Sequence, residues 1–324
     1  GPAWQDRFQR LEFDGFDPDA CHGKERIADY YEAYAEQFEA PIRTGVEVKK
    51  IERNARRPGF AIETSDGELE ANRVVAATGP FQNPVIPPIA PADSGITQIH
   101  SAEYRNPGQL PEGAVLVVGA GSSGAQIADD LQRGGRKVYL SVGPHHRPPR
   151  AYRSRDFTWW LGVLGEWEAE AIKPGTEHVT IAVSGARGGH TVDFRTLALA
   201  GMTLVGRTKA IHDGTATFEA DLADNIAAGD ENYLSLLDAA DDYAARNGLD
   251  LPQEPAARRI PADPECVTHP LRDLDLTAAG VRTIIWATGF NNDFSWLNGN
   301  GLDKDGQPRH RRGISPDPGI YFLG

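Results

Sequence analysis

Residues 115–131 read VLVVGAGSSGAQIADDL, and this stretch decides the fold class predicted for the chain. Four apolar residues lead into Gly119, Gly121 and Gly124, spaced G-x-G-x-x-G, and a helical pattern follows. In a strand–loop–helix unit the first glycine permits a tight turn, the second lets the backbone approach a pyrophosphate, and the third lets helix and strand pack closely. The helix N-terminus then offers amides to the phosphates. The stretch therefore predicts a dinucleotide-binding unit; the alternative is a glycine-rich turn without a ligand.

The end of the second strand of this unit bears on which nucleotide binds. We expect that strand at KVYLSV, residues 137–142, and no carboxylate follows it to accept a hydrogen bond from a ribose 2′-hydroxyl. The next stretch, 143–155, instead carries four basic side chains near its start: His145, His146, Arg147 and Arg150. Cations at this place suit a 2′-phosphate, so we predict NADP, with Arg147 as the phosphate partner. The alternative is that 143–155 is a solvated basic loop.

The segment before the glycine loop predicts a helix and three strands. Apolar residues recur at helical spacing over 27–38, and strand-like runs cover 45–52, 60–64 and 68–77 as a meander. Residues 80–95 carry five prolines and are interpreted as an inter-domain linker. We also expect a helix over 219–247 and a buried strand in VRTIIWATGF, residues 281–290, which ends in A-T-G as the run before residue 80 does.

Composition excludes several classes of function. The chain has 324 residues and a net charge of −13, which argues against nucleic-acid binding. No apolar run approaches the roughly 18 residues of a membrane span. Cys21 and Cys266 are far apart and form no metal-binding or C-x-x-C spacing, so we expect neither a metal site nor dithiol chemistry. A reducing cytoplasm is the expected compartment.

Five segments together carry a family resemblance. These are ATGPFQNPVIPP, GITQIHSAEYRNP, the glycine-loop stretch, WATGFNNDFSWL and PGIYFLG. In this order they resemble the flavin-containing monooxygenase family in its broad sense, which includes Baeyer–Villiger and auxin-forming relatives. The chain departs from the family's F-x-G-x-x-x-H motif, because Gly95 and His100 are one residue too far apart and the phenylalanine position is not filled.

The resemblance implies an α/β fold with two dinucleotide-binding, Rossmann-like, three-layer domains. An NADPH domain (111–274) would be inserted into an FAD domain (1–110 and 275–324). The glycine loop would be the second of two, and the first, for FAD, would precede Gly1. We therefore expect these 324 residues to bind FAD poorly and to lack a flavin absorbance band.

The resemblance also implies the chemistry. NADPH would reduce FAD, and reduced flavin and oxygen would form a peroxyflavin that oxygenates a small organic substrate. A homodimer is possible, and no nucleic acid or membrane partner is expected. Trp4 and His100 are the candidates closest to the flavin chemistry; a histidine that only bonds the backbone of the linker is the alternative for His100. The predicted cofactor-binding residues are Ala77, Thr78, Gly79, Gly119, Gly121, Ser122, Ser123, Gly124, Gln126, Arg147, Ala287, Thr288 and Gly289.

Two other functions stay open at this point, and a hydrolase is not favoured. A flavin-linked reductase of the pyridine nucleotide-disulfide class would need a redox cysteine pair. A truncated NADP-binding module would bind nucleotide without flavin turnover. A hydrolase would need paired carboxylates, but Asp129 and Asp130, like Asp241 and Asp242, are adjacent in helical segments and point about 100° apart, as solvated faces do. Trp159 and Trp160 either line a substrate entrance or belong to the core.

Overall fold

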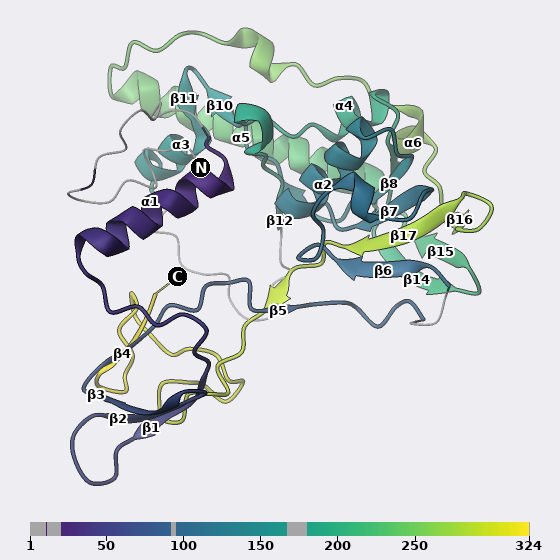
Figure 1. Ribbon diagram of the computed structural model, residues 1–324. Coiled ribbons are helices and arrows are strands. Elements are labelled where there is room, and N and C mark those ends of the chain that lie inside the picture. The colour runs from purple at the N-terminus through teal and green to yellow at the C-terminus, as the bar shows by residue number, and fades with distance from the viewer. Residues whose placement is uncertain (1–10, 12–20, 92–94, 167–179, 324) are drawn as a thin grey trace. The chain divides into compact units, whose positions relative to one another are not determined.

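The computed structural model describes residue 11 and residues 21–91, 95–166 and 180–323 (Figure 1). Contacts divide the chain into two compact units, and each is discontinuous in sequence. Unit 1 comprises Gly1–Tyr34 and Ile86–Thr288, and unit 2 comprises Ala35–Val85 and Gly289–Gly324. The helices are α1 (Lys24–Gln37), α2 (Ser122–Arg133), α3 (Phe157–Val163), α4 (Phe194–Leu199), α5 (Leu222–Arg246) and α6 (Glu265–Thr268). Short 3₁₀ turns cover Pro107–Gln109, Ala186–Gly188 and Pro255–Arg258.

A five-stranded parallel sheet forms the centre of unit 1 (Figure 1). Its strands are β6 (Thr97–His100), β7 (Ala114–Val118), β8 (Val138–Ser141), β13 (Thr203–Val205) and β17 (Val281–Trp286). Their spatial order is β13-β8-β7-β17-β6. Every residue of β7 and β8 is buried, as expected for a parallel sheet that is covered on both faces. The predicted glycine-loop unit, β7–α2–β8, is confirmed.

The two faces of this sheet are covered differently. On one face, Val115, Val117 and Leu140 pack with the apolar side of α2 and with Phe194 of α4. On the other face, Leu116 and other strand residues pack against a small antiparallel sheet. That sheet consists of β14 (Thr208–His212), β15 (Thr215–Phe218) and β16 (Asp273–Asp275). Unit 1 therefore has three layers, but the third layer is a β-sheet where helices are usual.

An aromatic cluster joins α3 and α5. Trp160 and Tyr233 are buried in it, and Trp159 lies partly buried beside them. Trp160 donates a hydrogen bond from its indole N–H to the carbonyl of Tyr152, 3.0 Å away. This confirms the core interpretation for Trp160. Three two-residue strands precede α3 in the sequence: β9 (His145–His146), β10 (Ala151–Tyr152) and β11 (Arg155–Asp156).

Unit 2 contains the predicted meander. Strands β1 (Val48–Arg53), β2 (Phe60–Thr64) and β3 (Gly67–Ala71) form an antiparallel sheet in chain order. The run predicted as one strand over 68–77 is two strands, because β3 pairs with β2 whereas β4 (Val74–Ala76) pairs in parallel with β19 (Ile320–Phe322). Ile51, Phe60 and Leu297 form the core of this unit with strand residues of β4 and β19. A short pair, β5 (Asn83–Pro84) and β18 (Phe290–Asn291), completes it.

The boundaries between the two compact units do not coincide with the predicted domain boundaries at 110/111 and 274/275. Strands β6 and β17 were expected in the FAD domain, but both are hydrogen-bonded into the parallel sheet that carries the glycine loop. For β17 the reason is that a buried apolar run looks the same whichever parallel sheet the strand joins. For β6, TQIH, the sequence has no apolar run that would place it in either sheet. The change of unit falls at Val85 and Ile86, inside the proline-rich segment, and at Thr288 and Gly289.

Candidate functional site

The glycines of the loop are fixed by close packing at the end of β7. Gly119 has φ +102°, and a Cβ on it would lie 2.4 Å from the carbonyl oxygen of Ala287. A Cβ on Gly124 would lie 1.9 Å from the carbonyl oxygen of Gly119. Only glycine fits either position, as the fingerprint of a nucleotide-binding turn requires.

Segments far apart in sequence meet at the carboxyl edge of the parallel sheet. The amide of Ala287 donates to the carbonyl of Val118 at 2.8 Å, so the second A-T-G segment starts beside the glycine loop. The amide of Ser101 donates to the carbonyl of Trp286 at 2.9 Å, which places the end of β6 there as well. The strand order reverses between β7 and β17. In open α/β sheets ligands bind outside the carboxyl ends of the strands at such a reversal.

The N-terminus of α2 lies at this edge of the sheet, directly after the glycine loop. Gly121 is its N-cap residue and makes no side-chain capping bond. An uncapped N-terminus presents amide donors and the positive end of the helix dipole, which together favour an anion. Ser123, in the first turn of α2, is exposed.

Residues 180–183, which we call the strap, lie against the glycine loop. A Cβ on Gly121 would be 3.2 Å from the Cβ of Thr180. The Ser122 hydroxyl donates to the carbonyl of Ile181 at 2.7 Å and accepts from the amide of Val183 at 3.3 Å. The Gln126 amide donates to the carbonyls of Ser122 and Val183 at 3.0 and 3.4 Å. Two residues predicted to bind the cofactor thus hold the strap.

The basic stretch after β8 is not a solvated loop. Arg147 is 3% exposed, and Arg150 and Arg153 are also buried. Arg147 donates to Asp230 Oδ1 through Nε and Nη2, at 3.0 and 2.6 Å, and its guanidinium lies 4.5 Å from the ring centre of Tyr233. The Arg147 that we predicted as the 2′-phosphate partner is therefore held within the protein in this structure. That assignment stays a prediction.

A second arginine lies near the end of β8. Arg207 follows β13, and its Cδ is 3.9 Å from the Cβ position of Gly143, which comes soon after β8. The Arg207 side chain is 54% exposed and lies 3.6 Å from the Asp221 carboxylate. Sequence reasoning missed Arg207, because it is 64 positions from Gly143 and only the pairing of β8 with β13 brings the two residues together.

His100 ends β6 and is almost fully buried. Its Nδ1 accepts a hydrogen bond from the amide of Ala102 at 3.1 Å, and its own amide donates to the Glu103 carboxylate at 3.0 Å. These bonds shape the turn that follows β6. The predicted role of His100 near the flavin stays a prediction, and Trp4 lies outside the described residues.

The first A-T-G segment, residues 77–79, lies in unit 2 and is exposed. The Gln82 amide donates to the Thr78 hydroxyl at 2.9 Å and to the carbonyl of Gly79 at 3.1 Å. The other end of the same amide group accepts from the backbone of Asp293 at 2.8 Å. Gln82 therefore ties the first A-T-G turn to the chain that follows Gly289.

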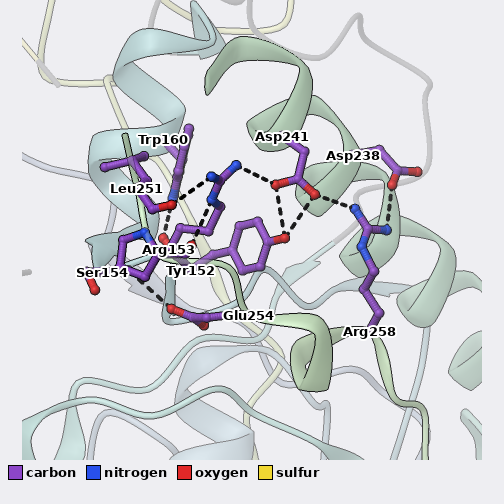
Figure 2. Close-up of polar contacts among 10 residues, drawn as sticks. Tyr152, Arg153, Ser154, Trp160, Asp238, Asp241, Leu251, Glu254 and Arg258 are labelled. Carbon is purple, nitrogen blue, oxygen red and sulfur yellow. Dashed lines mark hydrogen bonds and ion pairs between the residues drawn. The ribbon is translucent and has the colours of Figure 1, made fainter. Parts of the chain in front are cut away.

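A polar network fixes the hairpin between β10 and β11 to α5 (Figure 2). Arg153 and Ser154, at the hairpin turn, both have positive φ angles, a conformation that costs free energy in non-glycine residues. Arg153 Nη1 donates to Asp241 at 2.9 Å, and its other nitrogens donate to two backbone carbonyls of the segment after α5. Asp241 also accepts from Tyr152 at 2.9 Å and from Arg258 at 2.8 Å. The network holds a strained turn in place.

The same bonds lower the pKa of Asp241. Partial burial by itself would raise this pKa, but hydrogen bonds from Arg258, Tyr152 and Arg153 outweigh burial. A carboxyl group whose pKa is lower in the folded state stabilises the fold above its unfolded-state pKa, and this contribution disappears as the pH falls through the folded-state pKa.

We expect Asp241→Asn to lower the free energy of unfolding by about 1–3 kcal/mol at pH 7, because three donors lose a charged acceptor. The difference from the wild type should shrink as the pH falls below about 4. Urea unfolding at several pH values measures both effects. Asp242→Asn is the matched control, because Asp242 is exposed on the same helix. A constant difference between the wild type and Asp241→Asn down to pH 2.5 would contradict the assignment.

The adjacent carboxylates are not acid–base pairs. Asp129 is 6% exposed and pairs with Arg133 and Arg187, so its interpretation as a solvated residue is wrong. Asp130 accepts a hydrogen bond from the Tyr104 hydroxyl at 2.6 Å. Among the described residues, no group of three His, Cys, Asp or Glu side chains could hold a metal ion. None of the helices in the described part of the chain is long and apolar enough to cross a bilayer.

Known proteins are similar to this chain in sequence. Residues 14–163 match the pyridine nucleotide-disulphide oxidoreductase family. A CzcO-like uncharacterized oxidoreductase of Geobacillus kaustophilus is 32% identical over 326 residues, covering all of this chain and 76% of its own. Flavin-containing monooxygenase iboF of Amanita muscaria is 39% identical over 111 residues, 32% of this chain and 20% of its own.

The solved structures give the same fold. The flavin-containing monooxygenase from Stenotrophomonas maltophilia superposes with a TM-score of 0.56 at 17% identity, covering all of this chain and 79% of that one. At this identity the likeness shows the fold, which is the α/β fold of flavoprotein oxidoreductases. The chain belongs to the flavin-containing monooxygenase-type family, whose cofactors, FAD and NADP, are those that the resemblance implied.

Proposed function

We propose that this protein is an NADPH- and FAD-dependent oxidoreductase of the monooxygenase type, which uses oxygen to oxygenate a small organic substrate. The observation that carries the proposal is the packing of Gly119 and Gly124 at the reversal of strand order between β7 and β17. At both glycines an added Cβ would collide with a backbone carbonyl oxygen. We call the loop 119–124 the nucleotide cradle: it lies at the edge where α/β sheets bind ligands, and its close packing is that of a dinucleotide-binding turn.

The residues around the cradle fit NADP. The amides at the start of α2 would bind the pyrophosphate, and the positive end of the helix dipole would favour its charge. The exposed Ser123 hydroxyl would add a further donor. Ala287 and the residues that follow it, at the end of β17, would lie beside the nicotinamide half of the nucleotide because this strand is the neighbour of β7 across the reversal.

We propose Arg207, rather than Arg147, as the partner of the 2′-phosphate. Arg207 is exposed beside Gly143, shortly after the end of β8, where the ribose 2′ position is recognised in this fold. Arg147 would have to leave its buried ion pair with Asp230 to reach a ligand. Breaking such a pair costs several kcal/mol.

The chain contributes part of an FAD site. Strands β4 and β19 are parallel, so their carboxyl ends lie at one edge of unit 2, and residues 77–79 follow β4 there. Gln82 shapes that turn through its bonds to Thr78 and Gly79. The sequence contains no second G-x-G-x-x-G loop, so these residues do not form a complete pyrophosphate cradle for FAD. The bound flavin would supply the redox chemistry.

NADPH consumption by the purified chain, with FAD in excess, tests the proposal. We expect NADPH to be consumed in an oxygen-dependent reaction, and NADH to be used at least about tenfold less well. Arg207→Ala should raise the Kd for NADPH but leave the Kd for NADH unchanged. Anaerobic NADPH oxidation that requires a disulfide would indicate a reductase instead. Nucleotide binding without oxidation, with FAD bound, would indicate a binding module.

A further inference from the structure

We propose that the strap, residues 180–183, closes the nucleotide cradle and must move before the pyrophosphate of NADPH can enter. The proposal rests on the assignment of the glycine loop as the NADPH site. It adds that the main role of the Ser122 hydroxyl is to hold the strap in its closed position through two hydrogen bonds, which we call the latch, and not to bind phosphate.

The first observation is steric. Gly121 is the glycine at which the backbone of such a loop approaches a pyrophosphate. Thr180 occupies that approach, because its Cβ lies 3.2 Å from the Cβ position of Gly121. A side chain in van der Waals contact with this face of the loop leaves no room there for two phosphate groups.

The second observation is the set of bonds between the strap and α2. Ser122 Oγ donates to the carbonyl of Ile181 and accepts from the amide of Val183, so one hydroxyl satisfies two backbone groups of the strap. Gln126 adds a longer bond to the carbonyl of Val183. These bonds come from the first turn of α2 and the turn after it, where the phosphates are expected.

The third observation is how the strap is attached to the rest of unit 1. Its strand β12 (Thr180–Ile181) pairs with β9 over two residues, the Thr180 hydroxyl donates to the carbonyl of Pro144 at 3.4 Å, and Ile181 is 48% exposed. Ala182, in contrast, is fully buried and donates its amide to the carbonyl of His146 at 2.7 Å. Because the Ile181 carbonyl and the Ala182 amide belong to one planar peptide group, opening of the strap breaks the Ala182 bond to His146 together with the bonds to Ser122.

The closed strap lowers the apparent affinity for NADPH. When only a fraction of the protein is competent to bind, the apparent Kd rises by the inverse of that fraction. Weakening the latch should therefore tighten NADPH binding. If Ser122 were a phosphate ligand, its removal would weaken binding. The two interpretations predict opposite signs.

Calorimetric titration of the full chain with NADPH tests the strap. We expect Ser122→Ala to bind roughly three- to tenfold more tightly than the wild type, because two hydrogen bonds of the closed state are lost. Thr180→Gly, which clears the space over Gly121, should also bind more tightly. Ser123→Ala is the matched control: Ser123 is the next residue of the same turn, is exposed, and is expected to bind NADPH no more tightly than the wild type.

The contrary outcomes are distinct. Weaker or unchanged binding by Ser122→Ala, with nucleotide bound by the wild type, would overturn the latch and leave the nucleotide site intact. Absence of NADPH binding by the wild type and by all three variants would overturn the nucleotide site and the strap together.

Hydrogen–deuterium exchange gives a readout independent of affinity. In the wild type, NADPH should speed exchange of the amides of residues 181–183, because the Val183 amide loses its bond to Ser122. In Ser122→Ala this exchange should already be fast without nucleotide. Slower exchange of these amides on NADPH binding to the wild type would overturn the proposal.

Discussion

Alanine in place of Gly124 is expected to lower the affinity for NADPH by on the order of 100-fold and to reduce the free energy of unfolding by about 3 kcal/mol or more. The added Cβ would lie 1.9 Å from the carbonyl oxygen of Gly119. A backbone atom cannot give way as the end of a flexible side chain can, so α2 must move away from β7. That shift displaces the amides that would bind the pyrophosphate.

Calorimetric titration with NADPH and urea unfolding measure the two effects of Gly124→Ala. Gly108→Ala is the control, because Gly108 is exposed in a 3₁₀ turn and its added Cβ would meet only the Asn106 side chain, at 3.3 Å. The control should be close to the wild type in both measurements. If Gly124→Ala bound NADPH with wild-type affinity, nucleotide binding would not depend on this loop.

Alanine in place of Asp230 is expected to reduce the free energy of unfolding by about 3–5 kcal/mol. Asp230 accepts from Arg147 at 2.6 Å and from Arg195 at 2.7 Å, and both arginines are buried. Removal of the carboxylate leaves two buried guanidinium groups without their shared partner. The loss of a buried charge partner costs far more than the loss of an exposed ion pair.

Chemical denaturation monitored by circular dichroism measures the effect of Asp230→Ala. Asp238→Ala removes a carboxylate from the same helix that is 66% exposed and pairs with Arg258, so it should cost no more than about 1 kcal/mol. Equal losses in the two variants would contradict the assignment of Asp230 as the centre of a buried ion network.

Secondary structure is predicted best from the sequence where neighbouring residues alone determine it. The glycine spacing, the apolar run before it and the helical pattern after it determine β7 and α2 without reference to the rest of the fold. The helix over 27–38 is confirmed by α1, and the meander by β1, β2 and β3, because turn residues and periodicity decide both locally.

Prediction fails where distant residues decide. The burial of Arg147 depends on Asp230, which is 83 residues away in the sequence. The two faces of the parallel sheet are covered by different structures. On one face β16 pairs with the β14–β15 hairpin after 54 residues of intervening chain, and no local pattern encodes that pairing. The strap likewise reaches Ser122 from nearly 60 residues downstream.

The central claim is that amides at the start of α2 bind the diphosphate of NADP. A crystal structure of the chain grown with NADP⁺ tests it most directly. We expect diphosphate oxygens within hydrogen-bond distance of the amides of residues 121–123, with the side chain of Thr180 displaced from Gly121. Nucleotide bound elsewhere on the chain, with Thr180 still packed on Gly121, would contradict the claim.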